Sequence, residues 1–188
     1  MRSVLVFVAI WLSVGSVCIA GEIGTRYGTE IEEKCLADIE EDVEVSFVSE
    51  KPCLGDTALS ASFIAVSLAD KAVSYEVVLI KEEAEWRIWG ISRSLQLDQS
   101  NGESFNIMLG DRAISVEDAR AAVGAVVGQL KSGESIIGVL LPDNREKWPN
   151  SLMVNTRDMK RKTLGGRVFR ATETDQGWTS EENGWWVI

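Results

Sequence analysis

The stretch "YEVVLIKEEAEWRIWGIS", Tyr75 to Ser92, holds two runs of β-branched and aromatic residues around a short charged turn. This pattern is typical of a β-hairpin. Residues 77–80 are all apolar, which indicates a strand covered on both faces and therefore central in its sheet. In the second strand, Trp86 would point to one face, and Arg87 and Trp89 to the other. The hairpin thus predicts an antiparallel sheet that carries a tryptophan on each face.

The segment before the hairpin predicts one helix and two more strands. Thr29 would cap the helix, together with Glu32 three residues later. Cys35 falls on the apolar face of this helix and is expected to point inward. Residues 43–49 and 58–68 follow, and their alternating or apolar patterns favour strands.

The segment after the hairpin begins with a polar, turn-rich connector at residues 98–103. A second amphipathic helix is expected from Ser115, as its cap, to Gly133, which would end it. Four further stretches then predict strands, at residues 135–141, 151–156, 166–173 and 184–188.

These elements predict an α+β fold in which antiparallel, curved sheets are packed against amphipathic helices. Residues 21–100 and 101–188 would form two similar α-β-β-β-β halves, each ending in a tryptophan-bearing strand. The likeness is at the level of elements, so two interpretations stay open: a duplication, or one compact domain built from both halves.

The first 20 residues have the layout of a secretory signal peptide. Arg2 precedes an apolar run, and a small-residue end leads to an expected cleavage site after Ala20. The alternative is an uncleaved membrane anchor, for which the apolar length is borderline. We therefore expect a periplasmic or secreted protein, attached to a membrane only if this segment is retained.

Removal of residues 1–20 would leave only Cys35 and Cys53. An even pair of cysteines in an oxidising compartment favours a disulfide. The bond would close a loop of about 18 residues and stabilise the fold by roughly 3 kcal/mol in the chain-entropy account. The alternative is a pair of free, buried thiols.

Composition excludes several kinds of function. The chain has no histidine, which rules out Ser-His-Asp and Cys-His catalysis and histidine-ligated zinc. It also lacks a nucleophile elbow, a phosphate-binding glycine loop and EF-hand spacing. The net charge of −10 argues against binding to nucleic acid. We expect no cofactor and no metal, and the sequence favours a protein without catalytic activity.

Tryptophan and arginine are the residue types that dominate protein-binding hot spots. Arg87, Trp89 and Trp186 are the candidate binding residues, because each ring lies in a strand where a neighbouring tryptophan takes the opposite face. Plain core packing of the rings is the alternative. Residues 157–170 form a basic run that could receive an anionic surface or pair with the protein's own acidic residues.

Two segments carry a resemblance to a known superfamily. "YEVVLIKEEAEWRIWGIS" resembles the terminal hairpin of cystatin-like cone domains, the nuclear-transport-factor-two-like superfamily, and "SVEDARAAVGAVVGQLKSGES" is similar to their first helix. Here the helix follows the hairpin, so the chain would need two copies, or a different fold that shares these parts. The resemblance implies a curved sheet wrapped on helices around a cavity or open face, in a superfamily that holds both enzymes and binding modules.

The leading hypothesis is an exported, non-catalytic protein that binds another protein, in the manner of an inhibitor or an immunity protein. The alternative is a small-molecule cavity protein, or a hydrolase of the cone-domain type, with an enclosed pocket and a buried carboxylate.

Overall fold

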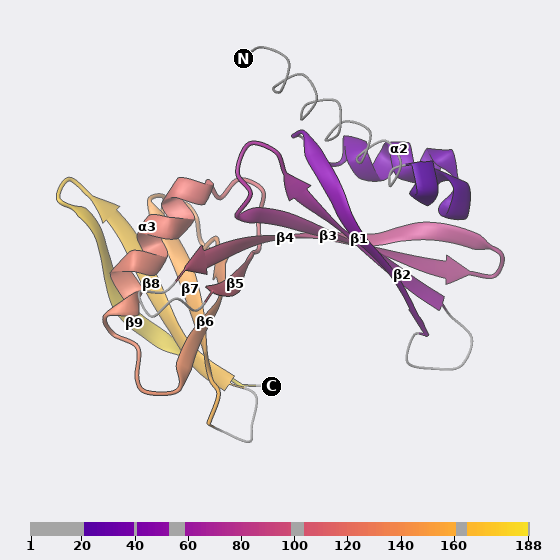
Figure 1. Cartoon of the computed structure of the whole chain (residues 1–188). Coiled ribbons are helices and arrows are strands. Elements are labelled where there is room, and N and C mark those ends of the chain that lie inside the picture. Colours follow the sequence, from indigo (N-terminus) through magenta and orange to yellow (C-terminus); the bar gives the residue numbers. More distant parts are fainter. Residues whose placement is uncertain (1–20, 40, 53–58, 99–103, 161–164, 188) are drawn as a thin grey trace, which may run out of the picture. The chain divides into compact units, whose positions relative to one another are not determined.

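The computed structural model describes residues 21–39, 41–52, 59–98, 104–160 and 165–187, and of residues 46–52 it describes the backbone alone. The chain divides into two compact units, Met1–Ser92 and Arg93–Ile188. The division falls inside a strand and not at the polar segment 98–103. Figure 1 labels the helices and strands of both units.

Unit 1 holds a helical segment at residues 21–27, helix α2, three strands and the first part of a fourth. Their bounds are α2 Thr29–Ala37, β1 Val43–Pro52, β2 Leu59–Ser67, β3 Val73–Glu82 and β4 Glu85–Asp98. Gly28 separates the two helical segments with a φ of 102° and is itself the N-cap of α2, without a side-chain cap bond. The predicted cap by Thr29 and Glu32 is therefore wrong, because a left-handed glycine turns the chain one residue earlier.

The sheet of unit 1 is an antiparallel meander. β2 pairs with β1 on one side and with β3 on the other, for example through Phe63, which lies opposite Val48 and Val77. β4 follows β3 in the strand order, so β3 is central, as predicted. Alternate residues of β2 and β3 are buried, and the core of the unit consists of Ile23, Cys35, Val45, Ala61, Phe63, Ala65, Tyr75, Val77 and Leu79.

Unit 2 begins in the second part of β4 and contains helix α3. Its further elements are β5 Ser104–Leu109, α3 Val116–Val127, β6 Glu134–Leu140, β7 Ser151–Asp158, β8 Gly165–Thr174 and β9 Gly177–Val187. β5 pairs antiparallel with β4 but parallel with β6, through Met108 opposite Gly138, and α3 is the crossover between them. β6 to β9 form an antiparallel meander, and α3 lies over one face of it (Figure 1).

The predicted α+β class is wrong. The structure is predominantly β, with 54% of the chain in strands and 19% in helices, and the strands follow one another in sequence order in a mixed sheet. Three features produce the difference. β4 and β9 extend well beyond their predicted stretches, β5 occupies a segment for which no strand was predicted, and the β5–β6 pair is parallel. Because β5 precedes the helix of unit 2, the two units do not share one α-β-β-β-β pattern.

Helix α3 starts as predicted but ends early. The Ser115 hydroxyl accepts a hydrogen bond from the backbone N–H of Asp118, so the predicted cap is confirmed. The helix ends at Val127, not at Gly133, because Gly128 is its C-cap and the next residues form tight turns. Gly133, with a φ of 91°, serves instead in the turn that leads into β6.

Within the described ranges, no helix combines the length and the apolar character that a bilayer crossing requires. The predicted signal peptide, residues 1–20, lies outside the described residues.

Candidate functional site

The two tryptophans of β4 lie on opposite faces of the strand, as predicted. The ring of Trp86 stands edge-on to the ring of Tyr27, with centroids 4.8 Å apart and planes at 76°. Lys81 Nζ lies 5.9 Å from the same Trp86 ring. Since Tyr27 belongs to the helical segment 21–27, Trp86 lies on the face of the sheet that the helices cover.

Trp89 lies on the other face and is 73% exposed. Arg87, two residues earlier on that face, is also exposed and pairs with Glu82 at 3.5 Å and Glu85 at 3.8 Å. A strand places residues i and i+2 side by side, so the structure brings the predicted residues Arg87 and Trp89 together. Exposure of Trp89 excludes the alternative of core packing for this ring.

Apolar side chains of the neighbouring strands lie on the same face of the sheet as Trp89. Glu82 alternates with Ile80 and Val78 along β3, and its ion pair with Arg87 places all of them on the Trp89 side. On β2, Ile64 is 36% exposed on the same side, opposite Glu76 of β3. We call the surface formed by Ile64, Val78, Ile80, Arg87 and Trp89 the Trp89 face. It has an apolar centre, and the described side chains of β3 and β4 around that centre include more carboxylates than cations.

The third predicted residue, Trp186, belongs to unit 2 and is engaged there. Its side chain is half-buried, and its indole N–H donates a hydrogen bond of 2.9 Å to the carbonyl oxygen of Thr156. The neighbouring Trp185 is the more exposed of the two, at 48%, with Lys131 Nζ 5.7 Å from its ring. Trp186 is thus held within unit 2, whereas the Trp89 face belongs to unit 1.

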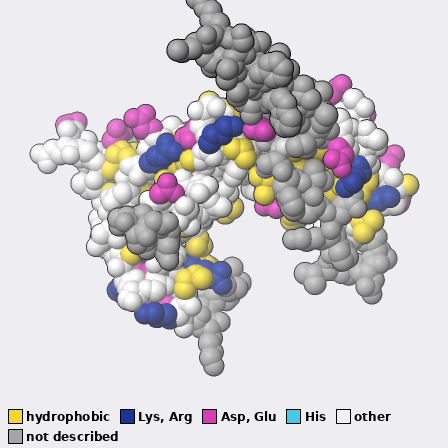
Figure 2. All heavy atoms as spheres, in the orientation of Figure 1, with side chains coloured by type: hydrophobic (Ala, Val, Ile, Leu, Met, Phe, Trp, Pro, Cys, Tyr) yellow, Lys and Arg dark blue, Asp and Glu magenta, His cyan; other side chains and the backbone are white. Residues whose placement is uncertain are grey.

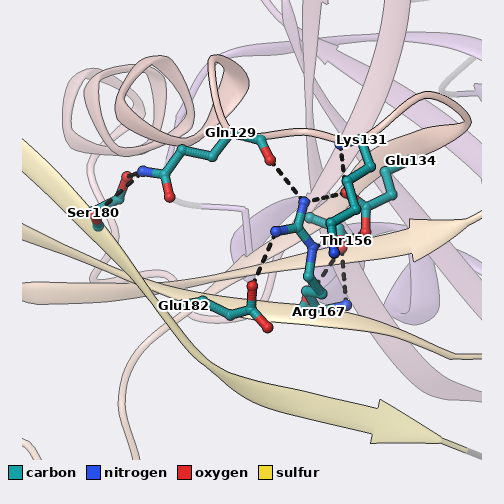
Figure 3. Close-up of polar contacts among 7 residues, drawn as sticks. All are labelled: Gln129, Lys131, Glu134, Thr156, Arg167, Ser180 and Glu182. Atoms are coloured by element: carbon teal, nitrogen blue, oxygen red, sulfur yellow. Dashed lines mark hydrogen bonds and ion pairs between the residues drawn. The ribbon is translucent and has the colours of Figure 1, made fainter.

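A buried ion cluster lies at one end of α3, and sequence reasoning missed it (Figure 3). The side chains of Arg167 and Glu134 are only 5% and 4% exposed and form a salt bridge. Arg167 Nε donates to Glu134 Oε1 at 2.8 Å, Nη1 to Glu182 at 3.0 Å, and Nη2 to the Gln129 carbonyl oxygen at 2.7 Å. The guanidinium also lies 4.6 Å from the Phe169 ring centroid. Every polar group of Arg167 is thus satisfied from within unit 2.

The cluster is suited to holding strands together, not to acid–base chemistry. The hydrogen bond from Arg167 holds the pKa of Glu134 below its usual range, and the same bond raises the pKa of Arg167. A general acid at neutral pH needs a raised carboxyl pKa. Glu134 is therefore a buried carboxylate, but not the proton donor that the hydrolase alternative requires.

The protein itself supplies acidic partners for two arginines of the basic run at residues 157–170. Arg170 pairs with Glu181 and lies over Trp148, with its guanidinium carbon 3.4 Å from the ring centroid, while Arg167 belongs to the buried cluster. On the surface shown in Figure 2, basic and acidic side chains are interspersed. These two arginines fit the alternative of internal ion pairs, and residues 161–164 of the run lie outside the described residues.

A pocket of about 430 Å³ lies between α3 and the sheet of unit 2. It is partly enclosed, and we call it the α3 pocket. Its apolar walls are Leu97, Phe105, Val123, Val127, Leu130 and Ile136, and its polar lining is Asp98, Arg120, Glu134 and Ser135. A second hollow, of 340 Å³, is lined by Trp148 and Arg170, which already contact one another.

Cys35 is a fully buried, free cysteine. Burial raises the pKa of its thiol to about 12, so the free form is protonated and unreactive at neutral pH. Cys53 lies outside the described residues, and the predicted disulfide stays a prediction. In the described part of the chain, no group of three or more acidic or cysteine side chains is arranged to hold a metal ion.

Comparisons with known proteins found no matching family model, no matching curated protein and no matching solved structure. The resemblance to cystatin-like cone domains thus stays an expectation drawn from two short segments.

Proposed function

We propose that this chain is an exported, non-catalytic binding protein whose partner is another protein, bound at the Trp89 face. The observation that carries the proposal is the 73% exposure of Trp89 on a sheet face that the helices leave uncovered. Burying a large apolar side chain is worth roughly 1.5–3 kcal/mol. An indole left in water next to an arginine is therefore a strong candidate for the centre of an interface.

The charges around Trp89 define the partner's chemistry. Among the described side chains of β3 and β4 on this face in unit 1, three carboxylates, those of Glu76, Glu82 and Glu85, stand against one cation, Arg87. The face therefore suits a protein that presents an apolar pocket for the indole, with lysine or arginine side chains around it. Such an excess of carboxylates would steer association and make its rate sensitive to salt.

Export is supported by the signal-peptide pattern of residues 1–20 and by the even cysteine pair that remains beyond it. Protein recovered from the culture medium or periplasm should begin at Gly21. It should have the mass of the disulfide form and resist alkylation without a reductant. Recovery of the full-length chain from the cytosol, with Cys35 and Cys53 alkylated after unfolding, would contradict export.

Partner capture tests the binding surface. The intact mature protein, immobilised, should retain at least one protein from an envelope or secreted fraction of the source cells. The variant Trp185→Ser is the matched control, because it removes a half-exposed tryptophan of unit 2. We expect the same protein to be retained by wild type and by Trp185→Ser but lost by Trp89→Ser.

With the captured partner purified, Trp89→Ser should weaken binding by about 2 kcal/mol, or roughly thirtyfold in dissociation constant. Equal affinity for wild type and Trp89→Ser, or equal losses for both tryptophan variants, would show that the Trp89 face is not the interface.

A further inference from the structure

The α3 pocket has the walls of a ligand site. Leu97 and Phe105 lie opposite one another on β4 and β5, and Val123 and Val127 face them from α3. Its volume of about 430 Å³ falls in the range of small-molecule sites, which are mostly apolar with a few polar groups. The pocket lies wholly in unit 2, so an inference about it is independent of the Trp89 face.

The row of α3 residues that lines the pocket indicates how long the pocket is. Arg120, Gly124 and Val127 stand at positions i, i+4 and i+7 of α3, which place them in one row. Seven residues of helix span roughly 10 Å. This length matches an extended alkyl chain of medium length better than a broad ring system.

The polar lining favours a ligand whose polar end donates hydrogen bonds. Asp98 accepts one from the Ser104 hydroxyl at 2.7 Å, and an ionised carboxylate has about four acceptor positions, so capacity remains. Glu134 is already engaged, because both of its carboxylate oxygens accept hydrogen bonds from Arg167. The open acceptor positions of Asp98 therefore decide which polar end fits, and they suit a group that donates hydrogen bonds better than an anionic end.

We propose that the α3 pocket binds a linear apolar molecule that ends in a hydroxyl or an ammonium group. The alkyl chain lies along α3 against Phe105 and Val127, and the polar end donates to Asp98. No covalent step is involved.

Gly124 offers a direct way to close the pocket. It lines the pocket, and a Cβ added there meets no described atom within 4 Å outside its own helix. Gly124→Leu therefore extends a side chain from a Cβ that has room toward the space of the ligand, and it replaces a poor helix former by a good one. Gly128→Leu is the matched control, since Gly128 is equally uncrowded, has an ordinary φ of −67° and is absent from the lining.

The test is calorimetric titration of the full mature chain with 1-octanol, octylammonium and octanoate, which share one alkyl chain. We expect saturable binding of octanol and octylammonium, with octanoate weaker by about tenfold or more. Gly124→Leu should weaken binding of the first two by at least about tenfold, and Gly128→Leu should leave it unchanged.

If Gly124→Leu does not fold, Gly124→Ala should weaken binding in the same direction. Absence of saturable binding, octanoate binding as tightly as octylammonium, or binding that is equal in the Gly124 and Gly128 variants would overturn the proposal.

Discussion

Both units contain an arginine close to a tryptophan, but the two pairs are in opposite states. In unit 1, Arg87 and Trp89 are exposed on an uncovered sheet face. In unit 2, Arg170 lies on Trp148, and Trp186 donates to a backbone carbonyl. The comparison teaches that residue type alone does not identify a binding surface. What distinguishes the units is whether the protein itself engages the tryptophan ring, as it does for Trp148 and Trp186 but not for the mostly exposed Trp89.

The difference has an energetic consequence. A charge buried like that of Arg167 is costly unless its partners are in place, so unit 2 depends on them for stability. An exposed ring such as Trp89 gains little from folding and is available for binding. Mutations of the buried cluster in unit 2 should therefore affect stability, and mutation of Trp89 in unit 1 should affect binding.

The largest effect is expected from Glu134→Ala. The variant leaves Arg167 buried without its main partner and should lower the free energy of unfolding of unit 2 by about 3–5 kcal/mol. Urea denaturation measures this loss. The double variant Glu134→Met with Arg167→Met should recover most of it, because apolar side chains of similar volume replace a buried pair well. A loss below about 1 kcal/mol, typical of a surface pair, would show that the cluster is solvated.

A smaller loss is expected from Trp186→Phe. This variant keeps an aromatic ring but removes the donor to the Thr156 carbonyl oxygen, at a cost of about 1–2 kcal/mol. Trp185→Phe, at the neighbouring and more exposed position, should stay within about 0.5 kcal/mol of wild type. Equal shifts of the melting temperature in Trp186→Phe and Trp185→Phe would contradict a stabilising role for the hydrogen bond of Trp186.

The ion cluster also predicts a pH dependence. The pKa of Glu134 is lower in the folded chain than its ordinary value of 4.5, so the unfolded chain binds more protons between the two values. The contribution of Glu134 to stability is therefore complete above pH 5 and is lost as the pH falls through the folded pKa. Unfolding in urea from pH 7 to pH 3 should show a steeper decline for wild type than for Glu134→Gln. Parallel curves of stability against pH for wild type and Glu134→Gln would contradict a stabilising role for the ionised carboxylate of Glu134.

The smallest effect on stability is expected from Trp89→Ser, within about 0.5 kcal/mol of wild type, because the ring is mostly in water. Thermal denaturation of the purified protein measures it. A loss of 2 kcal/mol or more would mean that Trp89 belongs to the core of unit 1, and the basis for a binding surface there would disappear.

Local patterns in the sequence predicted the parts of the fold that depend on near neighbours. The apolar run at 77–80 predicted a central strand, alternation placed Trp86 and Trp89 on opposite faces, and Ser115 predicted the start of α3. The alternation of Phe105, Ile107 and Leu109 in β5 was a usable signal for a strand that was overlooked.

The remaining features depend on contacts between distant segments. Arg167 reaches Glu134, 33 residues away, and Trp186 reaches Thr156, 30 residues away. No local pattern encodes such pairs, so the sequence left open whether the basic run and the ring of Trp186 have partners within the protein. The parallel pair of β5 and β6 is also a contact between distant segments. Helix α3 connects the two strands and brings β6 back beside β5.

Oxidative footprinting of the tryptophans tests the central claim most directly. The purified protein and the protein in its native extract are exposed to the same dose of hydroxyl radicals, and oxidation of Trp89 and Trp185 is quantified by peptide mass spectrometry. We predict that Trp89 is readily oxidised in the purified protein and protected in the extract, while Trp185 reacts equally in both. Equal oxidation of Trp89 in the two samples would contradict the claim that a partner covers this face.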